Sequence, residues 1–174
     1  MRFPDGPLSD GVVTLRLWED GDAAWYAAAA HDPDIQRWTT EPADLDEATV
    51  LRAIERMMST RASYGTVVTD AATGERLGNA GLAPDPGDPG VLELSYWLAP
   101  AGRGRGAATR AASLLVGWAR ECGVRRVGLH ARIDNIGSQR VAERAGFIRD
   151  RVVPDYRVVK GESWTVVFYT LDLS

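Results

Sequence analysis

Residues 91–119 contain a strand-like run, a glycine-rich loop and a helical pattern in direct succession, and this order constrains the fold more than any other stretch. Residues 91–98 are rich in strand-forming types, whereas residues 99–106 carry a proline and three glycines, which is typical of a turn. After the turn, apolar side chains recur with helical spacing at Ala111, Leu114, Leu115, Trp118, Ala119 and Cys122. Such a junction presents backbone N–H groups at a helix N-terminus, where an anion such as a pyrophosphate can bind.

The loop Gly102-Arg103-Gly104-Arg105-Gly106 leaves two interpretations open. It is neither a dinucleotide fingerprint, since Thr109 stands where the third glycine is required, nor a Walker loop, since no Gly-Lys-Ser/Thr follows. One interpretation is a plain strand-to-helix connection in which glycine gives tight geometry and arginine gives solubility. The other is an anion site, because arginines at the positive end of a helix dipole are unfavourable unless an anion lies nearby.

A second strand and helix follow. Residues 124–132 form a strand-like run with small or apolar side chains at Val124, Val127, Leu129 and Ala131. A helix is expected over about residues 136–145, because Gly146 is suited to the position just beyond a helix C-terminus. The chain thus contains, in order, a strand, an R-G-x-G-x-A loop, a helix, a strand, an N-x-x-S helix and a Gly-Phe pair.

This series of motifs resembles the acyl-CoA-binding core of the GNAT acyltransferase superfamily, and within it the branch that acetylates the N-terminal amines of ribosomal proteins. Leu15-Arg16-Leu17, residues 33–38 and Ser95-Tyr96-Trp97-Leu98 fit the same branch. The resemblance covers about residues 12–173 and is strongest over residues 93–147. It implies an α/β fold with a mixed, mostly antiparallel central sheet, flanked by helices and splayed at the acyl-CoA site.

The order of elements expected along the chain agrees with a mixed sheet. Strands are expected near residues 12–18, 64–70, 76–83, 148–156 and 164–173. One helix is expected to begin with Asp20 or Asp22 as its cap and to end near Ala30, before residues 35–42, which read as irregular. A second helix from about residue 45 to residue 61 has an apolar stripe made of Val50, Ile54, Met57 and Met58, which we interpret as core packing.

The resemblance also implies which residues bind acetyl-CoA. The pyrophosphate is expected to accept hydrogen bonds from the backbone N–H groups of the loop residues Arg103, Gly104, Arg105, Gly106, Ala107 and Ala108. The pantetheine amides are expected to pair with the backbone of Trp97 and Leu98, where the strand splays from its neighbour. Asn135 is expected to contact the pantetheine arm.

Transfer of an acyl group from a thioester to an amine requires a neutral amine and a stabilised leaving thiolate. Glu93 is the first candidate for deprotonating the amine, directly or through a water, because an acid on the central strand has this role in many GNAT enzymes. A strand carboxylate paired with an arginine is the alternative interpretation. Glu162, Asp155 and Tyr156 are secondary candidates, because the last hairpin often borders the acceptor site in this branch.

Ser138 is the candidate that hydrogen-bonds the departing sulfur. Many GNAT enzymes place a tyrosine seven residues after the asparagine to protonate the thiolate, but this chain has Ala142 there. The ribosomal branch has a serine where those enzymes often have alanine, and Ser138 occupies that position. The alternative is that Asn135 and Ser138 only cap the helix, although both roles can coexist.

Other reactive residues form no recognisable set. His31 and His130 show no sign of acting together, and His130 is interpreted as a sheet residue. Cys122 is interpreted as a core residue on the apolar helix face. The sequence has no metal-ligand spacing and no G-x-S-x-G motif. The tryptophans at positions 18, 25 and 38 fit an acceptor pocket or core packing equally well.

Composition narrows the class of protein. The chain has 174 residues, 45% of them hydrophobic and 25% charged, which predicts one globular domain over residues 1–174. A net charge of −4 argues against dedicated nucleic-acid binding. The single cysteine, Cys122, allows no intrachain disulfide and favours a cytoplasmic location. No apolar stretch approaches the roughly 20 residues of a membrane span, and the N-terminus has no apolar signal core.

These features predict an acetyl-CoA-dependent N-acetyltransferase that works by direct transfer in a ternary complex, without a metal. The acceptor is a protein N-terminus or a small amine such as an antibiotic or polyamine. A non-catalytic acyl-CoA-binding sensor is the alternative from another class. The chain is expected to be a monomer or a homodimer that does not associate with membranes.

Overall fold

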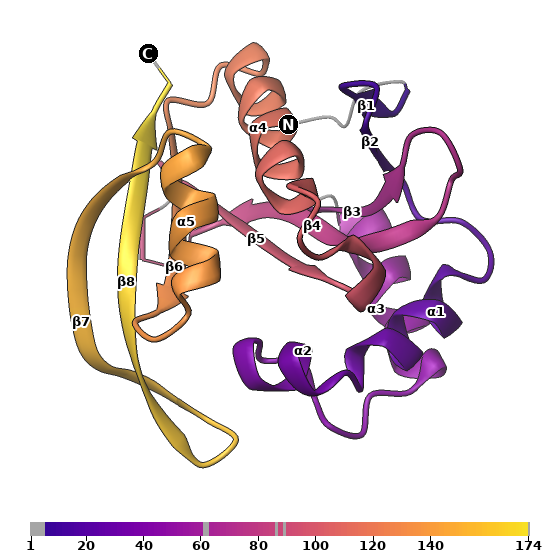
Figure 1. Cartoon of the computed structure of the whole chain (residues 1–174), viewed down its shortest axis with the longest axis horizontal. Coiled ribbons are helices and arrows are strands. Elements are labelled where there is room, and N and C mark those ends of the chain that lie inside the picture. The colour runs from indigo at the N-terminus through magenta and orange to yellow at the C-terminus, as the bar shows by residue number, and fades with distance from the viewer. Residues whose placement is uncertain (1–5, 61–62, 86, 89, 174) are drawn as a thin grey trace.

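One eight-stranded sheet runs through the molecule in the strand order β1-β2-β3-β4-β5-β6-β8-β7 (Figure 1). The computed structural model describes residues 6–60, 63–85, 87–88 and 90–173. Neighbouring strands pair antiparallel except for β5 and β6, which pair in parallel. The predicted mixed, mostly antiparallel sheet is therefore confirmed. The strands are β1 (Leu8–Ser9), β2 (Val13–Arg16), β3 (Tyr64–Asp70), β4 (Arg76–Pro84), β5 (Leu92–Leu98), β6 (Arg126–Arg132), β7 (Ile148–Val159) and β8 (Glu162–Asp172).

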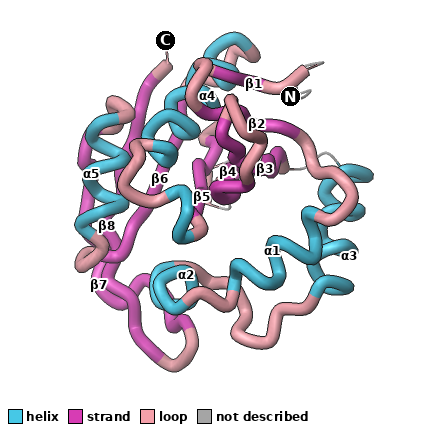
Figure 2. The backbone as a smooth tube through the Cα atoms, turned by 45° about the vertical axis from the view of Figure 1, so that its right-hand side comes forward, coloured by secondary structure: helices cyan, strands magenta, loops and turns pink. Residues whose placement is uncertain are grey.

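Five α-helices of the described residues flank this sheet in two groups, which Figures 1 and 2 show from different sides. The helices α4 (Ala107–Glu121) and α5 (Ile136–Arg144) pack on the main core, whose centre includes Leu94, Leu115 and Tyr169. The helices α1 (Asp22–Ala30), α2 (Pro33–Trp38) and α3 (Glu47–Thr60) form the second group, with small apolar clusters of their own. None of the described helices combines the length and apolar character needed to cross a bilayer.

Strands β5 and β6 separate soon after they meet, which confirms the splay that the motifs imply. Strand β5 pairs with β4 over its whole length, from Leu92 to Leu98. Its parallel pairing with β6 covers only two positions, Leu92 opposite Val127 and Glu93 opposite Gly128. From Leu94 onward the two strands diverge, so the edge of β5 that faces β6 has no strand beside it.

The junction from β5 to α4 has the predicted order of strand, turn and helix. A short 3-10 helix (Pro100–Gly102) turns the chain, and Gly102 lies so close to β4 that a Cβ atom there would be 2.5 Å from the carbonyl oxygen of Leu77. Gly104 and Gly106 have φ angles of 73° and 74°, in the left-handed region that favours glycine. The glycines of this loop therefore meet two different requirements, close backbone approach and left-handed turns.

Several local predictions were wrong. Residues 35–38, the first part of the stretch 35–42 that was predicted to be irregular, belong to helix α2, because Asp32 accepts hydrogen bonds from the N–H groups of Asp34 and Ile35 and Pro33 occupies the first turn. Neither Asp20 nor Asp22 caps helix α1, whose cap is Gly21. The carboxylate of Asp22 instead is fully buried among Arg16, Arg76 and the N–H of Glu19.

Two predicted core residues are exposed. Cys122 follows the last residue of α4, where the chain turns away through Gly123, so the helical spacing that placed it on the apolar face no longer applies. Met58 is 47% exposed, although Val50 on the same predicted stripe is buried. The second predicted helix ends at Thr60, and its expected last residue, 61, lies outside the described residues.

Candidate active site

A cleft of about 650 Å³ occupies the space where β5 and β6 separate. Its walls come from β5, β6, the loop before α4, the first residues of α4 and α5, helix α2 and the hairpin of β7 and β8. Ten of the predicted site residues line this cleft: Glu93, Trp97, Leu98, Arg103, Gly104, Gly106, Ala107, Ala108, Asn135 and Ser138. Arg105 does not line it. The sequence therefore located the cleft, whereas the individual roles of these residues stay predictions.

The two faces of strand β5 serve opposite sides of the cleft. Tyr96 and Leu98 pack against the main core under α4. Trp97 points the other way, into a cluster with Ile35 of α2 and Trp25 of α1, whose indole stacks on that of Trp97 at 5.7 Å between ring centroids. Strand alternation places Glu93 on the same face as Trp97. The cleft thus has an α4/α5 side and an α1/α2 side, which meet along β5.

Both loop arginines are paired with carboxylates of the protein. The guanidinium of Arg103 forms ion pairs with Asp32 and Asp34 at the start of α2, and its Nε donates to the carbonyl oxygen of Leu98. Arg105 pairs with Asp70, 2.5 Å away. The negative charges that arginines near a helix N-terminus require are therefore supplied by carboxylates of the chain itself. The arginine side chains consequently give no separate indication of a bound pyrophosphate.

The backbone of the loop remains suited to an anion. The first N–H groups of α4 have no intrahelical partner, as at every helix N-terminus, and Ala107 and Ala108 place them against the cleft. The N–H of Arg103 is already used, because it donates to the carbonyl of Pro100. Within the predicted group of six, the backbone N–H of Arg103 is therefore the one already engaged within the described residues, and binding of an anion by the others stays a prediction.

Asn135 and Ser138 have separate roles at the start of α5. Asn135 is the N-cap, and its Oδ1 accepts from the N–H of Ser138 at 3.0 Å. The Ser138 hydroxyl lies 2.8 Å from the hydroxyl of Tyr96 on β5. Burial raises the pKa of Tyr96 to about 12, so this phenol keeps its proton throughout the neutral range. The pair places two hydroxyl groups on the α4/α5 side of the cleft.

Glu93 belongs to a chain of three side chains on the α1/α2 side. Its Oε1 lies 2.9 Å from Nδ1 of His130 on β6, and Nε2 of His130 lies 2.5 Å from a guanidinium nitrogen of Arg157 on β7. Since a guanidinium only donates, Nε2 accepts and the ring proton sits on Nδ1, facing Glu93. The hydrogen bond from His130 lowers the pKa of Glu93 despite the opposing effect of burial, and the charge of Arg157 acts in the same direction. The alternative from the sequence, Glu93 paired with an arginine, is not what the structure shows: the partner of Glu93 is His130, which in turn contacts Arg157.

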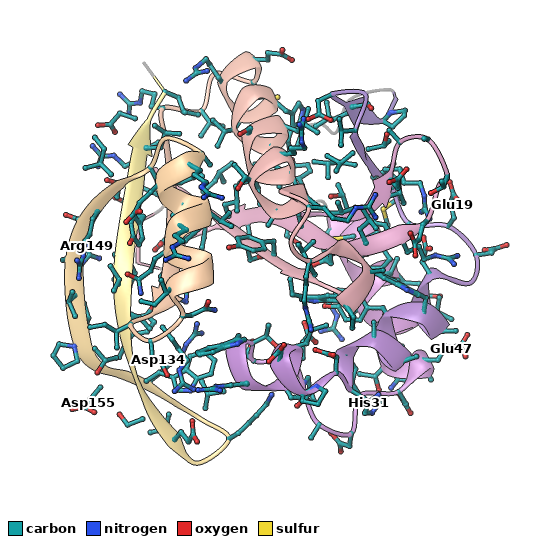
Figure 3. The ribbon with its side chains drawn as sticks, viewed as in Figure 1. Glu19, His31, Glu47, Asp134, Arg149 and Asp155 are labelled. Carbon is teal, nitrogen blue, oxygen red and sulfur yellow. The ribbon has the colours of Figure 1, made fainter. Side chains whose placement is uncertain are left out.

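The last hairpin closes the α1/α2 side of the cleft. Lys160 at its turn donates to the carbonyl and side-chain oxygens of Gln36 on α2, at 2.6 and 2.8 Å. The secondary candidates lie outside the cleft lining: Glu162 is paired with Arg132, and Asp155 accepts from Ser163 on the outer edge of the hairpin (Figure 3). Tyr156 packs edge-on against His130. Their positions make Glu93 the nearest of the predicted bases to the splay.

The tryptophans divide between the two roles that the sequence left open. Trp38 lines the cleft, with the guanidinium of Arg132 5.3 Å from its ring centroid. Trp25 packs on Trp97, and Trp18 donates its Nε1 hydrogen to the carbonyl of Gly65 outside the cleft. Among the described residues, no cluster of three or more potential ligands could hold a metal ion.

Sequence reasoning missed Tyr96, His130 and Arg157 as site residues. Tyr96 lay within a quoted motif, but its partner Ser138 is 42 positions away. His130 was correctly placed in a strand, yet its pairing with Glu93 depends on the parallel register of β5 and β6. One signal was available: Glu93 and His130 are polar residues at inward positions of otherwise apolar strands, which is where a site residue would stand out.

Comparison with known proteins decides the family. A family model described as the acetyltransferase (GNAT) domain matches residues 13–148 of the chain. The chain belongs to the GNAT acetyltransferase family. A curated relative, the uncharacterized N-acetyltransferase YjdG of Bacillus subtilis strain 168, is 33% identical over 85 residues, which are 48% of this chain and 50% of that protein. The chain thus spans about half the length of this curated relative.

Solved structures of GNAT enzymes share the whole fold. The spermidine N-acetyltransferase of Vibrio cholerae, in complex with CoA and spermine, has a TM-score of 0.83 and 18% identity, over 94% of this chain and 97% of that one. The ribosomal-protein-S5-alanine acetyltransferase of Vibrio fischeri has a TM-score of 0.82 and 17% identity, over 98% of both chains. At such low identity these likenesses show the fold alone.

Proposed function

We propose that this protein is an acetyl-CoA-dependent N-acetyltransferase that transfers the acetyl group directly to an amine in a ternary complex. The single observation that carries the proposal is the two-sided cleft, in which the Ser138 hydroxyl and the Glu93 carboxylate face the splay from opposite sides of β5. A thioester entering from the α4/α5 side and an amine entering from the α1/α2 side would meet there. Bringing both reactants together supplies much of the rate enhancement in such a reaction.

The loop and the splayed strand can bind acetyl-CoA because both have backbone hydrogen-bonding groups that are unpaired within the described residues. The N–H groups from Gly104 to Ala108 at the start of α4 suit a pyrophosphate. The edge of β5 beyond Glu93 has no strand beside it, so Trp97 and Leu98 can pair with an amide-containing arm such as pantetheine. Asn135 holds the start of α5 in place beside that arm through its cap.

In the proposed reaction, the amine nitrogen bonds to the acetyl carbonyl carbon and the carbon–sulfur bond breaks. Starting from the ammonium form, the nitrogen loses two protons: the first goes to Glu93 and then to solvent, and the second goes to the departing thiolate. Glu93 is ionised at neutral pH because its pKa is lowered, so it attracts the ammonium form and accepts its proton directly or through water. Ser138 donates a hydrogen bond to the departing sulfur, and Tyr96 donates to Ser138 in turn. The protein thus provides a base for the ammonium proton and a hydrogen-bond donor for the thiolate.

The identity of the acceptor amine is part of this proposal and is suggested by the relatives. The named activities of the structural relatives include acetylation of a ribosomal protein and of spermidine. We favour a protein N-terminus, in keeping with the motifs of the chain, and take a small amine as the alternative.

The proposal also includes a cytoplasmic location, supported by the single unpaired Cys122, and one domain, supported by the continuous sheet from β1 to β7.

An acceptor screen tests this function. The protein is incubated with acetyl-CoA and a panel of peptides, polyamines and amino compounds, while release of free thiol and formation of acetylated amine are followed. Amine-dependent thiol release with an equal amount of acetylated amine supports the enzyme. Binding of CoA without turnover of any amine would support the alternative, a non-catalytic sensor.

A further inference from the structure

Two guanidiniums of the cleft lining, those of Arg157 and Arg144, have no carboxylate partner among the described residues; Arg144 is exposed at the end of α5, whereas Arg157 is partly buried on β7. Arg103 and Arg132 line the same cleft, but Arg103 pairs with Asp32 and Asp34, and Arg132 pairs with Asp134 and Glu162. Arg157 also lines the cleft, and no carboxylate of the described residues lies within ion-pair distance of it. Its guanidinium donates a hydrogen bond to the imidazole of His130.

The Nε–H of Arg157 is the one buried side-chain donor or acceptor without a partner in the described part of the chain. A buried donor left unsatisfied costs about 1–3 kcal/mol, so native proteins rarely keep one without a use for it. The guanidinium carbon lies near two aromatic rings, 5.4 Å from the centroid of Tyr156 and 5.7 Å from that of Trp164. Its nearest carboxylate in this chain of contacts, Glu93, is separated from it by the His130 imidazole.

Arg157 and Glu93 stand at the two ends of the His130 imidazole. The α1/α2 side of the cleft therefore presents a carboxylate and a guanidinium one imidazole apart. An ammonium group suits the first and a carboxylate or phosphate suits the second. A purely cationic amine would leave the charge of Arg157 uncompensated and would be repelled by it.

We propose that the acceptor carries an anionic group, a carboxylate or a phosphate, a few bonds from the reacting amine, and that the guanidinium of Arg157 binds this group from the wall of the cleft. This inference rests on the proposed acetyl transfer and specifies its substrate class. It places the anion subsite between the β7/β8 hairpin and β6, with the amine directed to Glu93. The favoured acceptors are then amino acids, phosphorylated amines or N-termini with a nearby acid, rather than polyamines.

The test compares acceptors that differ only in the anion: glycine with glycinamide, L-serine with L-serinamide, and O-phosphoethanolamine with ethanolamine. The kcat/KM for each is measured with the wild type and with Arg157→Gln. Comparing the anionic-to-neutral ratio between the two proteins cancels the intrinsic reactivity of each amine. We expect Arg157→Gln to reduce that ratio about tenfold or more in at least one series, since a charge-assisted hydrogen bond is lost. The series that responds distinguishes a carboxylate from a phosphate.

Arg151→Gln is the matched control, because Arg151 lies on the same strand, is paired with Asp150 and is outside the cleft lining. It should leave the ratio unchanged. Arg157→Lys keeps the charge and should retain part of the preference, which guards against a folding defect in Arg157→Gln. An unchanged ratio in folded Arg157→Gln, or a wild type that prefers the neutral amines in every series, would overturn the inference.

A binding measurement separates this inference from the proposed function. Calorimetry with the CoA-saturated protein gives the affinity of each acceptor without turnover. If no amine is acetylated but the anionic amines bind more tightly in a manner that depends on Arg157, the transfer proposal fails and the anion subsite stands. If amines are acetylated without any dependence on Arg157, the subsite fails and the transfer stands. If neither acetylation nor binding of the amines depends on Arg157, the proposal of an anion subsite is wrong.

Discussion

Glu93 Oε1 and His130 Nδ1 lie 2.9 Å apart at the point where β5 and β6 stop pairing. This contact ties the two strands together immediately before they diverge and fixes the carboxylate at the end of the splay. Because Nε2 of His130 accepts from Arg157, the hydrogen bond to Glu93 has a defined direction. Glu93 therefore links the two strands where their pairing ends, and its carboxylate lines the cleft at the same point.

Replacing Glu93 tests its role as the base. We expect Glu93→Gln to lower the turnover rate about 10²–10⁴-fold at pH 7, the usual contribution of general-base catalysis. The loss should shrink as pH rises toward the pKa of the acceptor amine, because the free amine then forms without help. Acetyl-CoA affinity should hardly change, and Glu162→Gln, which alters an exposed carboxylate outside the cleft lining, serves as the control.

A purely structural Glu93 gives a different result. The variant would then show a lower melting temperature and a loss of rate that does not ease with rising pH. Full activity of Glu93→Gln at pH 7, with activity lost in Glu162→Gln, would move the base to the last hairpin. A pH–rate profile and a melting curve on each variant separate these outcomes.

The two hydroxyls on the other side should act as a unit. We expect Ser138→Ala to lower kcat by about tenfold or more while changing the Kd for acetyl-CoA less, because a bond to the thiolate forms mainly in the transition state. Tyr96→Phe removes the group that orients Ser138 and should lower kcat in the same direction. The double variant should be little worse than Ser138→Ala.

Ser113→Ala is the control for this pair, since Ser113 is exposed on α4 and does not line the cleft. It should leave kcat nearly unchanged. Additive losses in the double variant would show that Tyr96 and Ser138 act independently. Equal turnover in Ser138→Ala would leave Ser138 without a role in departure of the sulfur.

The glycine loop should matter for binding acetyl-CoA. Gly106→Val puts a branched side chain at a φ of 74° and moves the N–H groups at the start of α4, so the Kd for acetyl-CoA should rise about tenfold, equivalent to about 1.4 kcal/mol. Gly104→Val should act in the same way. Gly123→Val is the matched control, because Gly123 has a φ of 76° with open space around it but lies at the far end of α4. Calorimetry on folded protein measures each affinity, and equal values for wild type and Gly106→Val would refute the loop assignment.

Asp22 should govern stability in acid. Burial by itself raises the pKa of its carboxyl group, but hydrogen bonds from Arg16, Glu19 N–H and Arg76 outweigh it and lower the pKa below the usual value. The stabilisation is therefore present above the usual aspartate pKa of about 4 and is lost as pH falls through the lower value of the folded state. Asp22→Asn should cost about 3 kcal/mol of unfolding free energy at pH 7, because it leaves two arginines without their partner.

The acid limb of the stability curve provides the check. Urea unfolding between pH 7 and pH 3 should show a shallower loss of stability in Asp22→Asn than in the wild type. Asp44→Asn, which alters an exposed carboxylate in the loop before α3, is the control and should behave like the wild type. Parallel curves for wild type and Asp22→Asn would contradict the assignment.

The strand, loop and helix from β5 to α4 could be predicted because their signals are local. Proline and glycine mark the turn, and the change of period from strand to helix marks the two flanking elements. Both ends of α5 could also be predicted, because Asn135 caps its start and Gly146, with a φ of 90°, follows its end. Helix α2 was missed because six residues are too few to show a period, and Asp32-Pro33 signals both the end of one helix and the start of the next.

The chain of Glu93, His130 and Arg157 could not be predicted from the sequence, because its contacts depend on the register of strands distant in the chain. Glu93 meets His130 through the short parallel pairing of β5 and β6, and Arg157 reaches His130 across β8 from a hairpin with an irregular register. The same holds for Tyr96 and Ser138, which approach each other only because α5 packs over the splay. Local patterns thus predicted which elements border the cleft, and tertiary packing decided which side chains meet in it.

The most direct test of direct transfer is a single-turnover experiment with intact-protein mass spectrometry. Excess protein is mixed with acetyl-CoA and an acceptor amine from the screen, and CoA, acetylated amine and the protein mass are followed over time. We predict one acetylated amine for each CoA released, with no acetyl group on the protein at any time. An acetylated protein that forms before the product, or CoA release without acetylated amine, would contradict direct transfer in the cleft between β5 and β6.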